Sequence, residues 1–450
     1  MLNIYTLLSA WIISQLFFYF DWPVRPDRIL FVVLLGHCFY SYSRGQLNRL
    51  SFGKTELCML VFTFVANLSL FLAGTNVTSG VGKNTQLLQV ANLSLYPFIT
   101  YFVAKHIPYS SQGVRRILKT LVLIGSYLGA TAIFERYGLD AFIWPRYIAD
   151  PSVGIHFGRA RGPFLNSVFL GLNLIFCMAA MLITWEAVKS SWRKILVVAI
   201  VADMLAIYFT NTRGTWIGLG IVFLTTLFFP VRMRRLITTL MCLAALAFVF
   251  GNASQFSLAK GTLFSKRQNT VLDREVNFKV AWIMGSENPI FGIGWGRMGS
   301  EWNKYYDEAG APEFGGWDGN HNEWLGVFAQ LGLVGLIPYL MIFALLGRLT
   351  LDTYRRLPQQ MAFEKCLTIC ALALLGSFVV MANFSDVHSS PLHNNLLFMF
   401  CGLVANVAYQ LNRTRWPVDP KAAGEATSEA TTTGFAGAQY RGASDAARIG

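Results

Sequence analysis

Long apolar runs, separated by short polar connections, make up most of this chain of 450 residues. Each run has roughly 17 to 25 residues, enough for an α-helix to cross about 30 Å of hydrocarbon. The predicted membrane spans are 2–20, 28–43, 56–73, 86–104, 117–134, 163–185, 195–210, 214–230, 236–250, 322–346, 364–382 and 392–411. The pattern therefore predicts an all-α polytopic membrane protein with about twelve transmembrane helices.

The charged residues agree with this interpretation. Hydrophobic residues make up 54% of the chain and charged residues only 14%, whereas soluble proteins have about 25% charged residues. The formal net charge of +13 comes from basic residues that stand between the apolar runs, so nucleic-acid binding is not indicated. Basic residues gather after every second run, which places both termini in the cytoplasm by the positive-inside rule. Residues 1–20 lack a basic start and a cleavage pattern, so they are expected to be the first span.

Three regions follow from this pattern. Residues 1–134 are expected to form a five-span scaffold, because their connections are short and carry little concentrated chemistry. Residues 135–412 carry the candidate chemistry and include the largest loop, 251–320, on the extracytoplasmic side between spans nine and ten. Residues 413–450 are rich in Ala, Gly, Thr and Ser, so a disordered cytoplasmic tail is predicted.

No metal or nucleotide cofactor is expected. All seven cysteines fall inside predicted spans, which leaves no disulfide framework for the outer loops. Cys366 and Cys370 have helical i,i+4 spacing, but no histidine is near them in the sequence, so small packing residues are the better interpretation. The chain has no zinc, P-loop or dinucleotide-binding motif.

A polar loop that turns into an apolar helix, residues 315–339, carries the most informative histidine. Asp318 and Asn320 are good N-cap residues. They are expected to place the next three residues in the first helical turn: His321, Asn322 and Glu323. Free backbone N–H groups and the positive end of the helix dipole would favour an anionic substrate there. The alternative is a capped transmembrane helix whose histidine lies in interfacial water.

Four arginines are predicted on the same outer face. Arg159 and Arg161 come just before a helix that enters the membrane, and Arg213 lies in a very short turn between two spans. Arg274 begins a predicted amphipathic helix, 274–284, which is expected to lie on the membrane surface. A charge near hydrocarbon is costly without a partner or water, so these arginines are functional candidates. The alternative for Arg213 is an interfacial side chain that reaches lipid phosphate.

The other histidines have simpler interpretations. His37 is expected to be packed and hydrogen bonded within the second span. His388 and His393 lie between the last two spans, where exposed polar turn residues are the expected interpretation, although either is able to join a site with His321.

Together, the outer groups suit one kind of reaction. Arginines bind phosphate through paired, charge-assisted hydrogen bonds and stay charged when partly desolvated. A histidine of near-neutral pKa can take a proton from a hydroxyl nucleophile. The set favours displacement of a lipid-linked pyrophosphate by a sugar hydroxyl, with His321 as base and Asp318, Asn322 and Glu323 nearby for substrate binding.

Four segments in this order resemble the O-antigen ligase and O-antigen polymerase superfamily of bacterial envelope proteins. The segments, within residues 135–345, are RARGPFLNSVFLG, TNTRGTWIG, DREVNFKVAWIMGSENPIFGIGWGRMG and HNEWLGVFAQLGLVG. The resemblance implies a metal-independent, inverting glycosyltransferase of the bacterial inner membrane. It also implies an undecaprenyl-pyrophosphate-linked glycan as donor on the periplasmic side, and a role in O-antigen, lipopolysaccharide or exopolysaccharide assembly.

The same resemblance assigns roles to individual residues. Arg213 and Arg274 would contact the pyrophosphate, Arg159 or Arg161 would assist, and His321 would activate the acceptor hydroxyl. Arg159 is preferred of the pair by its spacing from the following Gly-Pro. The chain departs from the family pattern at Thr212, where serine is common, and at residues 166–167, where Asn-Ser replaces His-Pro.

Two questions stay open at this stage. Ligases and polymerases differ in the acceptor, which is a lipid core sugar or protein for one and another lipid-linked chain for the other, and the sequence does not choose between them. A transporter or flippase of lipid-linked glycan is the alternative from another class. It would have related halves, broken helices or charges near the bilayer midplane, and Asp203 is the one acid well inside a span.

Overall fold

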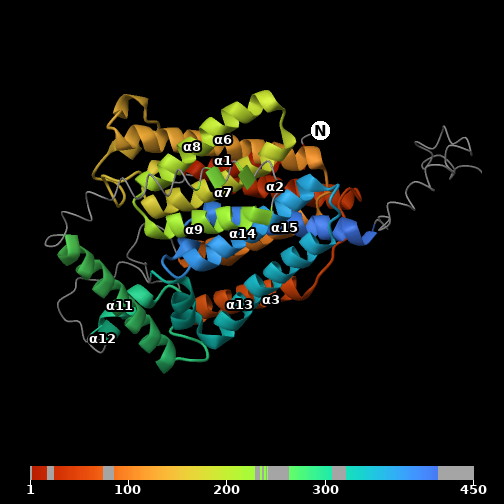
Figure 1. The fold of residues 1–450 in the computed structure, drawn as a ribbon. Coiled ribbons are helices and arrows are strands. Elements are labelled where there is room, and N and C mark those ends of the chain that lie inside the picture. Colours follow the sequence, from red (N-terminus) through yellow and green to blue (C-terminus); the bar gives the residue numbers. More distant parts are fainter. Residues whose placement is uncertain are drawn as a thin grey trace, which may run out of the picture. The chain divides into compact units, whose positions relative to one another are not determined.

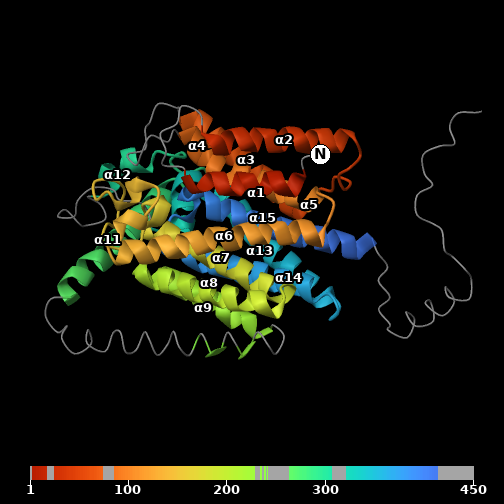
Figure 2. The same cartoon turned by 90° about the horizontal axis from the view of Figure 1, so that it is seen from above.

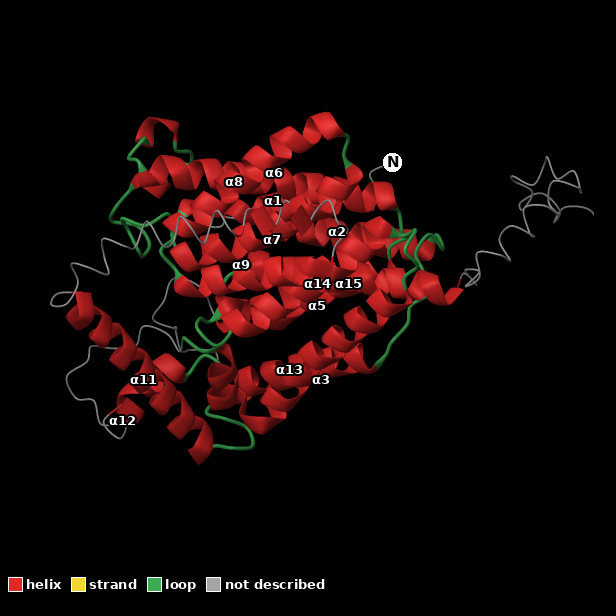
Figure 3. Ribbon diagram, viewed as in Figure 1, coloured by secondary structure: helices red, strands yellow, loops and turns green. Residues whose placement is uncertain are grey.

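The computed structural model describes residues 3–17, 25–73, 86–228, 263–306 and 321–413, with a few residues between 234 and 241. Every regular element among them is a helix (Figure 3). The helices are α1 Ile4–Ser14, α2 Pro26–Ser43, α3 Lys54–Ala73, α4 Gln86–Val90, α5 Tyr96–His106, α6 Ser111–Arg136, α7 Ser167–Ala187, α8 Ser190–Phe209, α9 Arg213–Thr225, α11 Leu263–Glu287, α12 Met298–Tyr306, α13 Glu323–Arg356, α14 Ala362–Met381 and α15 Pro391–Arg413. A π-helical segment, Ala91–Leu95, joins α4 to α5.

Seven of the described helical stretches are long and apolar enough to cross a membrane: α3, the α4–α5 stretch, α6, α7, α13, α14 and α15. The predicted class, an all-helical polytopic membrane protein, is therefore confirmed, whereas the number of twelve spans is not tested. Eleven of the predicted spans coincide with a helix of the structure, although α1 and α9 are short. The predicted span at 236–250 lies largely outside the described residues, and so do the predicted tail beyond 413 and Asp318.

The core of the bundle is formed by α7 and α15, which run through its middle (Figures 1 and 2). In the most apolar window of each, 89% and 94% of residues are buried, against 33% for α3. A helix that is apolar all round, as α7 is, has no face to offer to water. Small residues let its neighbours approach closely, as where Gly171 of α7 lies against the side chain of Thr215 in α9.

A break at Gly332 divides α13 into two parts. Gly332 has φ 60° and ψ −161°, a conformation that is essentially restricted to glycine. The loop that follows α11 supplies the missing backbone partners at the break. The N–H of Ile293 donates to the carbonyl of Ala329 at 2.9 Å, and the N–H of Gly294 donates to the carbonyl of Gln330 at 3.0 Å. In return, the N–H of Leu333 donates to the carbonyl of Pro289 at 2.8 Å. The outer half of α13, residues 323–331, is thus held by the loop that follows α11.

This junction also requires glycine in the loop. A Cβ on Gly292, which has φ 67°, would lie 2.3 Å from the carbonyl carbon of Gln330. A Cβ on Gly332 would lie 2.3 Å from the carbonyl oxygen of Ile290. The two glycines therefore allow backbone to approach backbone, which no other residue permits at this distance.

We expect Gly332→Ala to lower the free energy of unfolding by about 3 kcal/mol, because a strained conformation and a backbone clash are added together. Thermal unfolding of the purified protein in detergent measures this change. Gly220→Ala in α9 is the matched control, because a Cβ there meets nothing within 4 Å. Equal melting temperatures for the two variants would contradict the assigned role of the break.

Candidate functional site

The connection between α14 and α15, residues 382–390, joins the N-terminal end of α13 (Figure 1); we refer to it as the α14–α15 loop. The backbone N–H of Glu323 donates to the carbonyl of Ala382 at 2.7 Å. The backbone N–H of His321 donates to Asp386 Oδ2 at 3.4 Å. The loop therefore fixes the residues at the start of α13.

Glu323, one of the predicted site residues, is almost fully buried, with a relative exposure of 1%. Its Oε2 accepts hydrogen bonds from His388 Nδ1 at 2.7 Å and from the His388 backbone N–H at 3.3 Å. Its Oε1 accepts a hydrogen bond from the Tyr339 hydroxyl at 3.1 Å. The positive end of the α13 dipole favours a negative charge at this position. Protein donors thus hold a buried carboxylate beneath the candidate site.

His388 and His393 are not exposed turn residues, so that prediction is wrong. The His388 side chain is only 15% exposed and is ion-paired to Glu323, while His393 is fully buried beside the rings of Phe176 and Phe378. Burial lowers the pKa of His388, but the carboxylates of Glu323 and Asp386 raise it more, so its pKa is raised above the ordinary value. The turn-forming residues of this segment predicted exposed side chains. They did not indicate that the segment folds inward and buries its histidines.

His321 precedes α13 and does not lie in its first turn. The N-cap is Asn322, whose Oδ1 accepts a hydrogen bond from the Leu325 N–H at 3.0 Å, so the prediction of a cap at Asp318 or Asn320 is wrong. His321 has φ 54°, a left-handed conformation that is uncommon for a residue with a side chain. Its imidazole is half-buried. The cap and the bond to Asp386 thus determine where this imidazole lies.

Arg213 and Arg274 come from two different helices, α9 and α11. Arg213 is exposed and begins α9. The next residue, Gly214, lies against the Met381 side chain at the end of α14. Partial burial lowers the pKa of Arg274, and the positive charge of Arg213 lowers it further. The charge of Arg213 is thus felt at Arg274, although the two arginines belong to different helices, α9 and α11.

The helix that carries Arg274 is longer than predicted. It extends over Leu263–Glu287, against the predicted 274–284. Val276 and Val280 of this helix are buried against α12 and α13, in a cluster that includes Trp302 and Ala329. Protein therefore covers this side of the helix.

The structure separates Arg159 from Arg161. Arg161 is fully buried, and its Nε lies 3.3 Å from Glu135 Oε1. Its two terminal nitrogens donate to three backbone carbonyls at 2.8 to 3.0 Å: those of Ile148, Asp150 and Val153. Arg159, in contrast, is exposed. Arg161 thus holds the loop between α6 and α7, and Arg159 is the arginine of the pair that can reach a ligand.

His156 is a neighbour of Arg213 that the sequence did not indicate. Ser167 Oγ lies 3.0 Å from His156 Nδ1 and 3.3 Å from the Thr212 hydroxyl, just before Arg213. The backbone N–H of Ala160 donates to the carbonyl of Phe209 at 3.1 Å. The α6–α7 loop is therefore attached to the α8–α9 turn, and a histidine accompanies the arginines. An isolated histidine in a glycine-rich loop gave no pattern from which to predict this.

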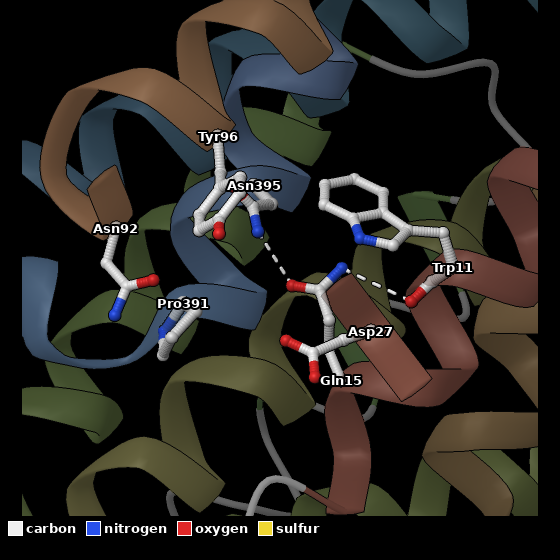
Figure 4. A pocket seen from close by; sticks show the side chains of 7 residues that line it. All are labelled: Trp11, Gln15, Asp27, Asn92, Tyr96, Pro391 and Asn395. Carbon is white, nitrogen blue, oxygen red and sulfur yellow. Dashed lines mark hydrogen bonds between the residues drawn. The ribbon is translucent and has the colours of Figure 1, made fainter. Parts of the chain in front are cut away.

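A small cavity lies between the end of α1 and the start of α2 (Figure 4). None of the predicted site residues lines it. Its volume is about 10 Å³, which is room for about one water molecule. Asn395 donates to Gln15 Oε1 at 2.7 Å in its wall. Among the described residues, no three His, Cys, Asp or Glu side chains gather as metal ligands would.

Comparisons with known proteins bear on this arrangement. A family model described as O-antigen ligase matches residues 195–340. An O-antigen ligase of Salmonella typhimurium is 22% identical over 377 residues, which cover 82% of this chain and 89% of that protein. The family match contains Arg213, Arg274 and His321, whereas Arg159 precedes it.

The buried pair of Arg161 and Glu135 gives a stability prediction. We expect Arg161→Ala to lower the free energy of unfolding by about 3–5 kcal/mol, because it leaves a carboxylate without its charge partner in a buried position. Chemical or thermal unfolding in detergent measures the loss. Arg159→Ala is the matched control and should leave stability nearly unchanged, since Arg159 is exposed. Equal losses in both variants would refute the separation of their roles.

Proposed function

Because this chain belongs to the O-antigen ligase and O-antigen polymerase superfamily, we propose that it transfers or polymerises glycan from an undecaprenyl-pyrophosphate-linked donor onto an acceptor hydroxyl. Membership in the family places the chain among multi-pass bacterial membrane proteins of O-antigen assembly. The observation that carries the detailed proposal is that both arginine-bearing helices connect to α13. The helix of Arg274 packs against α13, and Gly214, beside Arg213, lies against Met381, whose neighbour Ala382 binds the N–H of Glu323.

The two guanidiniums supply the site for the pyrophosphate. Arginine matches phosphate oxygens in pairs and stays charged when partly desolvated. Arg213 is also the first residue of α9, where free N–H groups favour an anion. Two cations that repel each other without a ligand are stabilised when a dianionic group binds between them. Arg159 lies on the loop attached to this turn and assists from the side.

His321 is proposed as the base. The acceptor oxygen attacks the anomeric carbon of the donor sugar from the face opposite the pyrophosphate, while its proton passes to the imidazole. The bond from the anomeric carbon to the pyrophosphate oxygen breaks, and the leaving group keeps the electron pair between the arginines. The configuration at the anomeric carbon is therefore inverted, and the arginines provide positive charge without a metal. Asn322, Glu323 and Asp318 complete the proposed binding set, of which Glu323 acts from a buried position.

The proposed orientation follows the charge pattern. Both termini are assigned to the cytoplasm and the site to the periplasmic side of the inner membrane. The acceptor is a glycan, lipid or protein with a free hydroxyl. A second lipid-linked chain as acceptor would make the protein a polymerase, and a lipid core sugar or protein would make it a ligase.

A transporter of lipid-linked glycan remains the second candidate because of Asp203. This carboxyl group is fully buried in α8, and neither of its oxygens has a hydrogen-bond partner. Gly125 and Gly129 of α6 leave the space that it occupies. A buried acid within a span is a common feature of transport pathways. Movement of labelled lipid-linked glycan across liposomes, without any new glycosidic bond, would favour this candidate.

We expect His321→Ala and Arg213→Ala each to reduce glycan transfer by at least about 100-fold, because they remove the base and a charge on the leaving group. The assay uses purified protein in liposomes, lipid-pyrophosphate-linked glycan and an acceptor, and product length separates polymer growth from transfer of one block. His37→Ala is the matched control and should retain activity. Near-normal transfer by His321→Ala would refute the assignment of the base.

We also expect the same assay to proceed at an unchanged rate in excess chelator, because the arginines supply the positive charge in the proposed reaction. Initial rates with and without chelator measure this. A loss of activity that a divalent ion restores would reject the metal-independent mechanism and leave the assignment of His321 open to a separate test.

A further inference from the structure

We propose that Glu323 and His388 are positioning residues of the reaction centre, whose mutual hydrogen bond fixes the α14–α15 loop on the start of α13 and so sets the place of His321. This inference rests on the proposed function of His321, but the contacts that carry it are independent of any reaction.

Two neighbouring bonds connect the pair to His321. Glu323 is two residues after His321, and His388 is two residues after Asp386. The His321 N–H donates to Asp386, and His388 donates to Glu323 through both its backbone and its ring. Together with the bond from the Glu323 N–H to the Ala382 carbonyl, these contacts join two short segments at three points. The His321–Asp386 bond is long, at 3.4 Å, so the bond of 2.7 Å between Glu323 and His388 is the stronger of the two side-chain contacts.

The backbone of His321 needs this support. A residue with a side chain at φ 54° persists in the left-handed region only when its surroundings hold it there. Asn322 caps the helix on one side of His321, and residues 307–320 on the other side lie outside the described residues. The bond from the His321 N–H to Asp386 reaches the α14–α15 loop, so the position of this loop bears on that of His321.

The same pair reaches the outer loop that follows α11. The ring of Trp295 packs edge-on against the His388 ring, with 5.4 Å between centroids. The backbone N–H of Trp295 donates to Ser69 Oγ in α3 at 2.9 Å, and the backbone N–H of Gly296 donates to Gln330 Oε1 at 2.7 Å. Three segments therefore meet at His388: the start of α13, the α14–α15 loop and the loop that leads from the helix of Arg274. A change at His388 is expected to displace His321 relative to Arg274.

Glu323 and His388 act through other groups and do not touch the substrate in this proposal. Glu323 is 1% exposed and its oxygens are bound by protein donors. The Nδ1 atom of His388 is committed to Glu323. Partners that orient an active group typically contribute about 10- to 100-fold to activity.

The experiment compares His388→Ala, His388→Asn and Glu323→Gln with the wild-type protein in liposomes. The amide nitrogen of asparagine can replace Nδ1 as the donor to Glu323, but asparagine has no ring and no charge. We expect His388→Ala to lower kcat by about 10- to 100-fold with little change in KM for the donor, and His388→Asn to recover most of kcat. Glu323→Gln should show an intermediate loss, and His37→Ala is the control.

Two outcomes would overturn the proposal. If His388→Asn were as inactive as His388→Ala while both proteins stayed folded, His388 would act through its other ring nitrogen on the substrate. If His388→Ala kept the wild-type kcat, the pair would have no role in the site.

Hydrogen exchange gives a readout that needs no enzymatic activity. We expect the peptide containing residues 321–325 to exchange at least about tenfold faster in His388→Ala, but at nearly the wild-type rate in His388→Asn. If the wild-type protein transferred no glycan yet showed this exchange pattern, the proposed function would fail and the positioning role would stand. Unchanged exchange in His388→Ala would refute the positioning role, whatever the activity.

The pH dependence tests the charge of the pair. The groups around His388 are Glu323 from α13, Asp386 from the loop and His393 from α15. Because the folded protein raises the pKa of His388 above 6.5, its contribution to stability is full below that value and is lost as pH rises through the raised pKa. We expect the difference in melting temperature between wild type and His388→Asn to shrink from about pH 6 to about pH 9. If the difference in melting temperature were the same at both pH values, the contact between His388 and Glu323 would not be ionic.

Discussion

The break in α13 imposes the main constraint on this structure. A membrane offers no water to bind free N–H and carbonyl groups, so an interrupted helix must find new backbone partners within the protein. The loop after α11 provides them, through bonds between residues 289–294 and residues 329–334. The helix of Arg274 and the start of α13 are thereby parts of one assembly. The position of the Arg274 helix relative to the start of α13 depends on these backbone bonds.

The candidate site is assembled from segments that are far apart in the chain. Arg213 comes from a turn between two helices, Arg274 from an outer helix and His321 from the entry to α13. The α14–α15 loop lies among them and contributes the carboxylate of Asp386 and the ring of His388. The chemistry of the site thus comes from loops and helix ends, while the membrane-spanning helices hold them in place.

Much of the fold and part of the site followed from the sequence. Apolar runs reveal helices because hydrocarbon sets their length, and Arg213 was evident because a charge beside an apolar run is unusual. Contacts between distant segments leave no such local pattern. Arg161 resembled a ligand-binding arginine but is bound to Glu135, and His388 resembled a surface residue but is bound to Glu323. In each case the partner lies on another element, and its position was decided by packing.

The bonds between residues 289–294 and residues 329–334 that repair α13 run from backbone to backbone, and two glycines make room for them. Backbone hydrogen bonds do not depend on which side chains the residues carry. Side chains on the outward side of this junction can therefore change during evolution without shifting the register between the loop and the helix. Such a frame would allow the surface around the junction to diversify while the segments that it joins stay in place.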